Sequence, residues 1–453
     1  MQIPVTAIFD IGKTNKKFFL FDDDLKEVHQ EYMQLNLIED DDGEPCEDLE
    51  SLIKWMRSTL MRALKSRDYN IKQLNFSGYG ASMVHLDSAG KPVTPLYNYL
   101  NPYPKSLQQQ FSEKYGEMEQ NDLETASPSL GMLNSGMQLY WLKYSKPKFF
   151  HRIKHSLHFP QFLSYLFTGE LVSEPTSIGC HTKLWDFRHN HYHQWIIQEG
   201  LDRLLPKIVP TVHHYYAQLN GQSIKTGVGV HDSSAALVPY IIRSTEPFIL
   251  ISTGTWSITL NPFTTEPLSM EELKKDCLTY LSINSKPVKA ARLFIGNEME
   301  YQMKVLNDIY HKDPEYYQSV SLNEDFIAKV ASGAISNRFF PKTIKNPLLL
   351  KVLDPNSWDP NSFNSYEEAY HHLVWGLVTL QRESLQLVNG NSPIKNVYMD
   401  GGFIHNDLFN KMLQYQLPDY SFNISSVPMG SAYGAALVIT NEAGKSGLAP
   451  NKN

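Results

Sequence analysis

The start of the chain alternates between short apolar runs and a long stretch of helical spacing. The apolar runs Val5–Phe9 and Phe18–Phe21 flank a short polar turn with basic residues, a pattern typical of two strands joined by a tight turn. Between Glu47 and Ser66 the apolar residues recur at helical spacing, which predicts a helix. The apolar segment Leu74–Val84 predicts a further strand of the same sheet.

The middle of the chain carries helix signals beside a region that has none. Gly136–Tyr144 predicts a helix. So does Ser156–Gly169, where Pro160 suits a first helical turn and Gly169 suits a left-handed stop. The region Tyr97–Leu133 is polar and aromatic, and its pattern predicts no element.

The later part of the chain begins with an apolar strand, Phe248–Ser252, and closes with a helix after the segment Ser425–Ala436. Small residues in that segment allow a helix to pack closely on a sheet. The turn residues of Asn389–Pro393 predict a loop. The acidic run Glu39–Glu44 predicts a solvated loop rather than a metal site.

A length of 453 residues exceeds one ordinary core and therefore predicts two domains. The domain change is expected between Leu237 and Pro247, where Pro239 and Pro247 flank a short predicted linker. We accordingly place the domains at residues 1–240 and 241–453.

Charge and cysteine content exclude several classes of protein. A net charge of −7 argues against general binding of nucleic acid, because nothing would neutralise the phosphates. The three cysteines, Cys46, Cys180 and Cys277, are far apart, which suggests neither a zinc site nor a disulfide framework. No signal-peptide pattern and no membrane-spanning apolar run is visible, so a cytoplasmic protein without a membrane anchor is expected.

The first candidate chemistry lies in the turn that follows Phe9. Asp10 ends a predicted buried strand, and a carboxylate in that position can hold a hydrated Mg²⁺. Turn amides, with Lys13, Thr14 and Asn15 around them, can hold phosphate oxygens. The same D-x-G-x-T pattern also fits an ordinary hairpin with a polar turn.

Three later segments place small or polar residues at the end of an apolar strand. They are Gly227–Ala236, Leu250–Ser257 and Val397–Asn406. At such positions a backbone can approach a ligand closely.

The order of these motifs resembles that of the FGGY carbohydrate kinases of the actin-like ATPase superfamily, from Ala7 to about Ile439. The resemblance implies an α/β fold of two RNase H-like domains, of the actin and hexokinase type, with a central cleft. It places the sugar site, the first phosphate hairpin and a catalytic aspartate in residues 1–240. Nucleotide binding is implied for residues 241–453.

Phosphoryl transfer needs in-line positioning, charge neutralisation and a base for the acceptor hydroxyl. The resemblance implies ATP and Mg²⁺ as cofactors, Asp232 as the base and Asp10 as the Mg²⁺ residue. From its local sequence alone, Asp232 could instead be a helix N-cap, and Lys17 a surface charge. The implied nucleotide contacts are Gly12, Lys13, Thr14, Asn15, Lys16, Lys17, Gly254, Thr255, Gly401, Gly402 and Asn406.

The motifs expected to contact the sugar resemble most closely those of the rhamnulose and fuculose kinases. Ser252–Ser257 looks like their S-S-G-T-W-S motif, and the spacing of Ser77–Val84 resembles the D-T-W-G-V-D segment of rhamnulose kinases. Ser77 and Ser82 stand where those kinases have aspartates, and Tyr97–Tyr99 replaces an acidic motif. The implied sugar contacts are Ser77, Tyr79, Gly80, Gln138, His231, Asp232 and Ser233.

A further segment, Glu174–Asp186, resembles the N-A-S-x-T-x-L-x-D motif of the family, with Cys180 and His181 at its centre. For these two residues, packing and hydrogen bonding compete with a catalytic role.

We therefore predict a kinase that uses ATP and Mg²⁺ to phosphorylate a ketose or related sugar or polyol, with L-rhamnulose and L-fuculose as candidate substrates. The alternatives are a xylulose, other pentulose or polyol kinase, and an actin-like ATPase without a sugar acceptor. A catalytically silent sugar sensor would need loss of Asp10 or Asp232, and both are present. A monomer or homodimer is expected.

Overall fold

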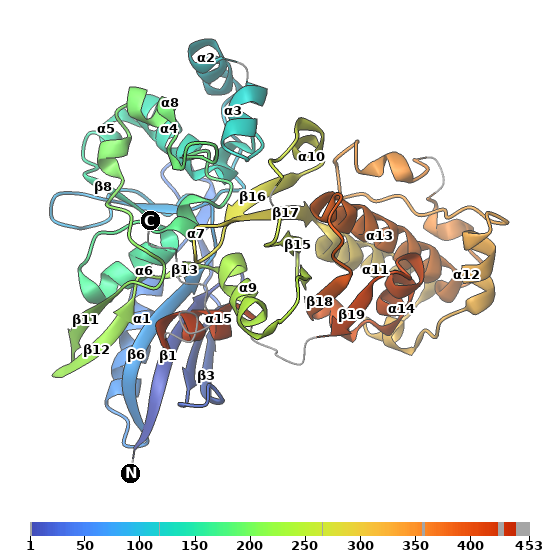
Figure 1. The fold of residues 1–453 in the computed structure, drawn as a ribbon, viewed down its shortest axis with the longest axis horizontal. Coiled ribbons are helices and arrows are strands. Elements are labelled where there is room, and N and C mark those ends of the chain that lie inside the picture. The colour runs from blue at the N-terminus through green and yellow to red at the C-terminus, as the bar shows by residue number, and fades with distance from the viewer. Residues whose placement is uncertain (1, 117, 265, 356–357, 425–429, 441–453) are drawn as a thin grey trace. The chain divides into compact units, whose positions relative to one another are not determined.

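The computed structural model describes residues 2–116, 118–264, 266–355, 358–424 and 430–440. The described residues form two compact units. The first unit contains residues up to 243, residues 279–287 and residues 430–440, and the second contains residues 244–278 and 288–424. Figure 1 labels the elements of both units.

The first unit is built on a mixed sheet. Its strand order is β11 (His214–Leu219), β12 (Gln222–Gly227), β6 (Tyr69–Gly78), β1 (Ile3–Ile11), β2 (Lys16–Phe21) and β3 (Glu27–Met33), with β13 (Val230–His231) also paired to β6. Strand β1 runs antiparallel to β2 and parallel to β6. The predicted pair of strands around a tight turn is confirmed.

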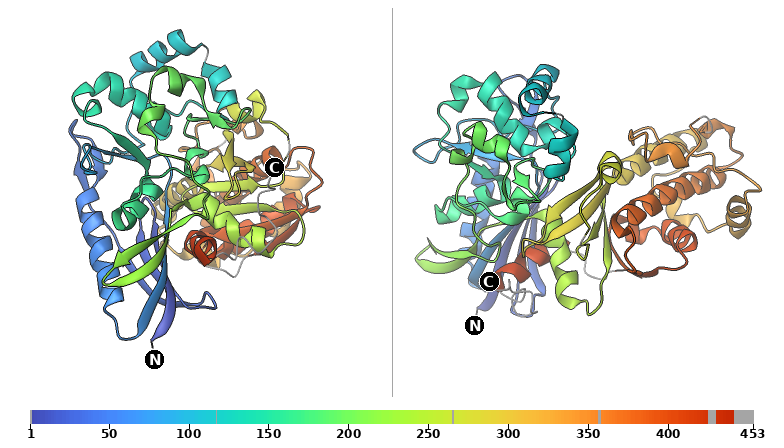
Figure 2. Two further views of the ribbon diagram at one scale, coloured as in Figure 1. Left: turned by 60° about the vertical axis from the view of Figure 1, so that its left-hand side comes forward. Right: turned by 45° about the horizontal axis from the view of Figure 1, so that its top comes forward.

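Alternation along β1 decides which side chains meet which helix. Its odd-numbered residues Val5 to Ile11 join the apolar core with α1 (Leu49–Leu64), the helix that the spacing predicts. Figure 2 shows α1 running alongside the strands of this sheet. The even-numbered residue Asp10 lies on the other face and accepts a hydrogen bond from Ser431 of α15 (Gly430–Thr440).

The prediction of a single strand over Leu74–Val84 is wrong. Strand β6 ends at Gly78, and β7 (Met83–Leu86) begins only after a turn in which Ala81 has a φ of 61°. Strand β7 then pairs with β8 (His155–His158) rather than with the main sheet. The apolar pattern continues through the turn because Tyr79 and Ala81 are buried there, so the pattern conceals the break.

The region Tyr97–Leu133, for which no element was predicted, contains α2 (Lys105–Tyr115), α3 (Met118–Glu124) and the 3-10 turn η1 (Gly131–Leu133). Helix α2 buries only Leu107 and Phe111, which is too few apolar positions to show a helical period. This region shares a separate core around Trp195 with helices α4 (Ser135–Ser145) and α8 (Gln194–Gln198). The remaining elements here are α5 (Pro147–Phe150), α7 (Pro175–Ile178), β9 (Trp185–Asp186), β10 (His191–Tyr192) and η2 (Asp202–Leu204).

Two of the predicted helix signals are confirmed in this unit. The predicted helix Gly136–Tyr144 lies within α4. The Pro–Gly helix signal is borne out by α6 (Phe159–Thr168), with Pro160 in its first turn and Gly169 in the left-handed conformation at its end, whereas residues 156–158 belong to strand β8. The acidic run Glu39–Glu44 begins at the last residue of the short strand β4 (Leu37–Glu39) and continues to the start of β5 (Pro45–Glu47).

The predicted linker at Leu237–Pro247 is wrong at its start, because α9 (Asp232–Arg243) continues through Pro239. Proline has no N–H group, so the carbonyl of Ala235 lacks its usual partner four residues later. The neighbouring backbone of α15 lies against that carbonyl at Gly434. The compact units change after Arg243, while a functional division at residues 240 and 241 stays a prediction.

A second sheet belongs mostly to the second unit, although Thr279–Leu281 of β16 and Pro287 of β17 are counted with the first. Its order is β16 (Cys277–Leu281), β17 (Pro287–Leu293), β15 (Ser257–Asn261), β14 (Ile249–Thr253), β18 (Asn396–Gly401) and β19 (Ser421–Ile424). The predicted strand Phe248–Ser252 is β14, which runs parallel to β18. The helices are α10 (Met270–Lys274), α11 (Ile295–Tyr310), α12 (Glu324–Ala331), α13 (Tyr366–Asn389) and α14 (Asp407–Gln416). Single 3-10 turns are η3 (Tyr316–Ser319), η4 (Leu350–Val352), η5 (Pro360–Ser362) and η6 (Gly402–His405).

Three further expectations concern the small-residue segment, membrane-spanning helices and the cysteines. Residues 425–429 of the predicted small-residue segment lie outside the described part of the chain, whereas its later residues form α15. Within the described ranges, no helix is both long and apolar enough to cross a membrane. Cys46, Cys180 and Cys277 are buried and form no disulfide bond.

The contact between α9 and α15 yields a test of stability. A Cβ atom at Gly434 would lie 1.8 Å from the carbonyl oxygen of Ala235. Gly434→Ala must therefore push the two helices apart, and we expect a loss of roughly 1–3 kcal/mol in the free energy of unfolding, measured with urea. Thr440→Ala at the end of the same helix is the control and should cost less than half as much. Equal losses would show that the close contact is unimportant.

Candidate active site

The first carboxylate of the candidate site is Asp10, the penultimate residue of β1. It is half-buried, and one of its oxygens accepts a hydrogen bond of 2.9 Å from the Ser431 hydroxyl. Burial raises the pKa of Asp10, whereas the nearby Lys17 and the Ser431 hydroxyl oppose that rise, and the negative charge of Asp232 adds to it. The structure thus brings the predicted metal residue and the predicted base near each other.

The turn after Asp10 is closed by a buried lysine. The N–H of Gly12 donates to the carbonyl of Asn15, and the ammonium of Lys16 donates to the carbonyls of Gly12 and Lys13 at 3.0 and 2.8 Å. The same ammonium lies 2.9 Å from the buried carboxylate of Glu47. Lys16 therefore holds the turn from inside, a role that its sequence position did not predict.

The other residues of the turn differ in where they point. The ammonium of Lys13 lies 3.2 Å from Glu47 and 4.9 Å from the ring centre of Tyr99, and burial lowers its pKa. Thr14 and Asn15 are exposed. Lys17 lies opposite Asp10 on β2. The side chain of Asn15 accepts from Gln34 at 3.3 Å, and the ammonium of Lys17 lies 5.8 Å from the ring centre of Tyr32.

The predicted base, Asp232, is the first residue of α9 and is half-buried. Its Oδ1 accepts hydrogen bonds from the N–H of Ser233, at 2.6 Å, and from the Ser233 hydroxyl, at 3.3 Å. Among the described residues, the polar contacts of this carboxylate all end on Oδ1. Oδ1 thus serves the contacts at the start of α9, and a catalytic role can use the other oxygen.

His231 lies buried directly before Asp232. Its Nε2 is 3.2 Å from Asp232 Oδ1 and 3.1 Å from the sulfur of Cys180. Burial lowers the pKa of His231, so the ring is neutral at ordinary pH. Its Nδ1 is buried without a hydrogen-bond partner among the described residues.

Gly80 is needed because His231 occupies the space beside it. A Cβ atom at Gly80 would lie 2.9 Å from His231 Nε2 and 3.3 Å from the Cys180 sulfur. The sequence predicted a close approach at this glycine, to a sugar. The structure shows that the close approach is to the imidazole and the thiol, so any effect on a sugar passes through His231.

The other predicted sugar residues are buried around the same turn. Ser77 lies at the end of β6, directly opposite Asp10. Tyr79 follows it, and burial together with the charge of Glu47 raises its pKa. Gln138 of α4 donates from Nε2 to the carbonyls of Ala81 and Met132. Gln138 thus fixes the backbone of the turn with the group that was expected to bind the sugar.

In the second unit, the predicted nucleotide residues line one pocket of about 260 Å³. Its walls include Gly254, Thr255, Gly296, Gly402 and Asn406, together with Met299, Glu300, Met303, Tyr317 and Phe403. A Cβ atom at Gly402 would meet nothing within 4 Å, so this glycine leaves space open. Gly401 is not among the lining residues, and its Cβ would lie 1.7 Å from the carbonyl of Thr253. Gly401 therefore serves close packing of β18 on β14.

Two polar groups in this pocket already have partners within the unit. The N–H of Gly254 donates to the carbonyl of Trp256 at 2.8 Å, whereas Thr255 is exposed. Asn406 caps α14 by accepting from the N–H of Phe409, and its Nδ2 donates to the Tyr370 hydroxyl at 2.8 Å. Asn406 thus lines the pocket, but both polar groups of its side chain are already hydrogen-bonded within the unit.

Comparison with known proteins decides the family. Residues 5–237, more than half of the chain, match the FGGY family of carbohydrate kinases, N-terminal domain. The chain belongs to this family. The predicted family and the prediction of a phosphotransferase enzyme are confirmed at this level.

One curated relative of this FGGY family member is a rhamnulokinase of Halalkalibacterium halodurans, which is 25% identical over 278 residues. The match covers 55% of this chain and 52% of the relative, so the chain spans about half the length of the curated relative it matches.

Solved structures of carbohydrate kinases share the fold over nearly the whole chain. A carbohydrate kinase from Novosphingobium aromaticivorans has a TM-score of 0.79 at 22% identity, covering 98% of this chain and 92% of that one. A xylulose kinase from Lactobacillus acidophilus has a TM-score of 0.76 at 13% identity, with 98% and 91% covered. A Plasmodium falciparum glycerol kinase solved with ADP has a TM-score of 0.72 at 17% identity, with 97% and 90% covered. The predicted α/β fold class is confirmed.

Sequence reasoning missed several residues at the site of this FGGY family member. Glu47 is buried between the lysines of the first turn, Cys180 contacts His231, and Ser431 binds Asp10. Cys180 was singled out at the centre of a family-like segment, with packing as the competing role. Glu47 and Ser431 carried no local signal, because their partners are remote in the sequence.

The pair Asp10 and Asp232 suggests a first test within the kinase reaction of this family. Asp10→Asn keeps the size of the side chain but removes a negative charge that can hold Mg²⁺. We expect turnover to fall roughly 10²-fold and the Mg²⁺ concentration for half-maximal rate to rise. Initial rates across a Mg²⁺ series measure both, with the exposed Asp68→Asn as the control. An unchanged Mg²⁺ dependence would make Asp10 structural.

The contact between Gly80 and His231 suggests a second test. Gly80→Ala should displace the imidazole and raise the KM for the sugar on the order of 10–100-fold, since small misplacements in an active site are costly. The KM for ATP should stay near its original value. Gly402→Ala is the reciprocal variant and should raise mainly the KM for ATP. Parallel changes of both constants in Gly80→Ala would indicate a general folding defect instead.

Proposed function

We propose that this chain transfers the terminal phosphoryl group of ATP to a hydroxyl of a ketose or related sugar, with Asp232 as the general base. The cofactors are ATP and Mg²⁺, and a cytoplasmic setting remains part of the proposal. The proposed reaction assigns roles to particular residues in each of the two units.

One observation carries the proposal: a half-exposed carboxylate stands beside a buried, neutral imidazole. Asp232 has its contacts with described residues on Oδ1, which leaves its other oxygen for an acceptor hydroxyl. The buried Nδ1 of His231 has no partner among the described residues. A buried polar atom without a partner costs free energy, which a sugar hydroxyl would recover.

The chemical step follows from these positions. Asp232 accepts the proton of the acceptor hydroxyl as the oxygen attacks phosphorus. The N–H of Ser233 at the start of α9 donates to the carboxylate and fixes its orientation. The neutral ring of His231 orients the sugar, and its own position is set by Cys180 and by the absence of a side chain at Gly80.

The residues present fit the two cofactors. Asp10 and Asp232 repel each other, and a divalent cation at Asp10 would relieve that repulsion. Asp10 would hold Mg²⁺, which supplies charge neutralisation for the phosphates when bound. ATP would occupy the pocket lined by Gly254, Thr255 and Gly402, where glycines let the backbone lie against a nucleotide.

The substrate class that we propose is narrower than carbohydrates in general. The rhamnulokinase relative and the Ser252–Ser257 motif favour a 6-deoxy ketulose such as L-rhamnulose or L-fuculose. Uncharged Ser77 and Ser82 in the turn favour a neutral sugar over an acidic one. A xylulose or other pentulose or polyol kinase is the second candidate, because solved structures of this fold include a xylulose kinase.

Removal of the base gives a direct test. Asp232→Asn keeps the size of the side chain, so we expect the sugar kinase rate to fall by about 10²–10⁴-fold while the affinity for ATP is kept. A coupled ADP assay and nucleotide-binding calorimetry measure the two quantities, again with Asp68→Asn as the control. Sugar phosphorylation at nearly the parent rate would remove Asp232 from the mechanism.

A substrate screen tests the reaction as a whole. ADP release is measured with ATP alone and with L-rhamnulose, L-fuculose, D-xylulose, glycerol and gluconate, and the product is located by NMR. A ketose should raise ADP release strongly, and Asp232→Asn should abolish that increase. Brisk hydrolysis of ATP alone, with no stimulation by any sugar of the panel, would support the actin-like ATPase instead.

A further inference from the structure

A cluster of metal-ligating side chains lies on the hairpin formed by β9 and β10, apart from the residues assigned above. Asp186, His189 and His191 each offer one ligand atom, and these atoms all lie within 4.8 Å of one another. We propose that this hairpin is a binding site for a transition-metal dication of the zinc class, separate from the Mg²⁺ that accompanies ATP.

The backbone of the hairpin brings the three residues to one side. Asp186 and His191 are directly opposed in the antiparallel pair of β9 and β10. Opposed residues of such a pair project from the same face of the ribbon. His189 lies in the connecting turn, and its ring stacks on that of His191 with ring centres 5.7 Å apart and planes 15° apart.

The carboxylate is fixed before any metal arrives. Asp186 is buried, and its Oδ1 accepts from the N–H groups of Arg188 and His189 at 2.8 and 3.1 Å. Its Oδ2 lies 2.9 Å from His189 Nδ1. These hydrogen bonds hold the carboxylate in one orientation.

The ring nitrogens of both histidines face defined partners. A carboxylate or a carbonyl can only accept a hydrogen bond, so a ring nitrogen that faces one is the donor. His189 Nδ1 faces Asp186, and His191 Nδ1 lies 2.7 Å from the carbonyl of Tyr192. At His189, an ion bound by Asp186 would replace the hydrogen bond at Nδ1. Nε2 of His191 is the nitrogen left for a metal, and a partner on the other nitrogen is the usual support of a metal-binding histidine.

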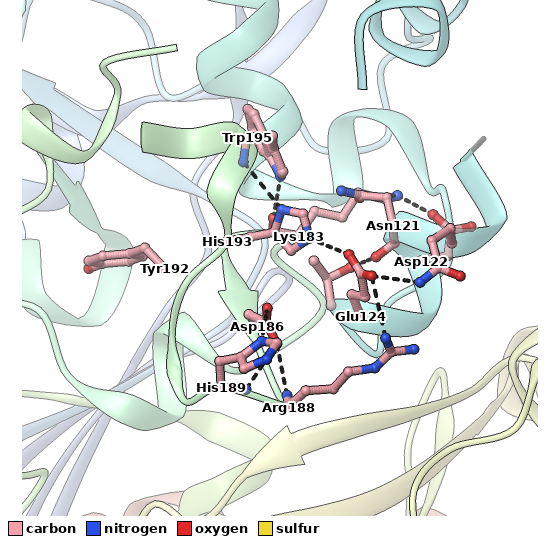
Figure 3. A network of polar contacts seen from close by, with 12 residues as sticks. Asn121, Asp122, Glu124, Lys183, Asp186, Arg188, His189, Tyr192, His193 and Trp195 are labelled. Carbon is pink, nitrogen blue, oxygen red and sulfur yellow. Dashed lines mark hydrogen bonds and ion pairs between the residues drawn. The ribbon is translucent and has the colours of Figure 1, made fainter. Parts of the chain in front are cut away.

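The surroundings keep the hairpin in place without competing for the ion. Figure 3 shows Asp186 and His189 close together, while the guanidinium of Arg188 extends toward Glu124. Glu124 also lies 2.8 Å from His193, and its carbonyl accepts from the N–H of Phe187. Helix α3 thereby anchors both ends of the turn, which reduces the ordering that binding requires.

The donor set selects the class of metal. Two imidazoles and one carboxylate suit zinc and its neighbours, whereas Mg²⁺ prefers oxygen ligands alone. His189 and His191 are exposed, so a fourth position stays open to water and the ion can exchange. Binding would tie the turn to β9 and so stabilise the first unit.

The test uses the full chain, freed of any affinity tag and of metals by a chelator. Zn²⁺ is titrated by calorimetry, and Co²⁺ is followed by its visible absorption, which reports coordination by nitrogen and oxygen in a low-symmetry site. The variants are His189→Ala and His191→Ala, with His151→Ala as the matched control, since His151 is an exposed histidine of the same unit.

We expect one equivalent of Zn²⁺ on the parent and on His151→Ala, with affinity at least about tenfold weaker in both hairpin variants. Zn²⁺ should also raise the melting temperature of the parent but not of the hairpin variants, and excess Mg²⁺ should not displace it. No saturable binding to the parent, or equal binding by all variants, would overturn the proposal. Because this test measures metal binding, its outcome does not depend on whether the proposed kinase reaction is found.

Discussion

The close contact of α15 with α9 is the constraint on which the candidate site of the first unit depends. Helix α9 begins with Asp232, and the first turn of α15 supplies Ser431 to Asp10. Their backbones meet where Pro239 deprives the Ala235 carbonyl of its helical donor and Gly434 offers no side chain. A residue with a side chain at that point would separate the helices. The two carboxylates on which the proposed chemistry rests would then lose their common support.

A second constraint acts through burial of charge. Glu47 is buried between Lys13 and Lys16, and a buried carboxylate must be paired to be tolerated. This pairing uses Lys16 to close the turn, so only part of the basic residues remains for phosphate. Charge in a turn sequence therefore overstates the charge that the folded turn presents. The structure assigns the lysines of one short motif to different tasks according to which way each side chain faces.

The elements with a regular apolar period could be predicted, and the interruptions could not. Strands β1 and β2 and helices α1, α4 and α6 follow from spacing, proline and glycine. The break after Gly78 escaped prediction because the turn is as buried as the strands beside it, and α2 escaped because it buries too little. At the site, motifs led to Asp10, His231 and Asp232, which lie near one another. They could not show that Gln138 and Asn406 satisfy backbone and side-chain partners of the fold, since those partners are remote in sequence.

The two units present different kinds of surface to the ligands of the proposed reaction. In the first unit the groups that would meet a sugar are side chains, and each is held by a neighbour: His231 by Cys180, Asp232 by Ser233. In the second unit the pocket is shaped by backbone at Gly254, Gly296 and Gly402. Side chains held in one orientation discriminate between hydroxyl patterns, because a wrong sugar leaves a buried polar atom unpaired. Glycines in the wall of that pocket let the backbone lie against a nucleotide, which can be common to a family whose sugars differ. Substitutions among Gly80, Cys180 and His231 are therefore where a change of sugar would arise with the fold and the nucleotide pocket left intact.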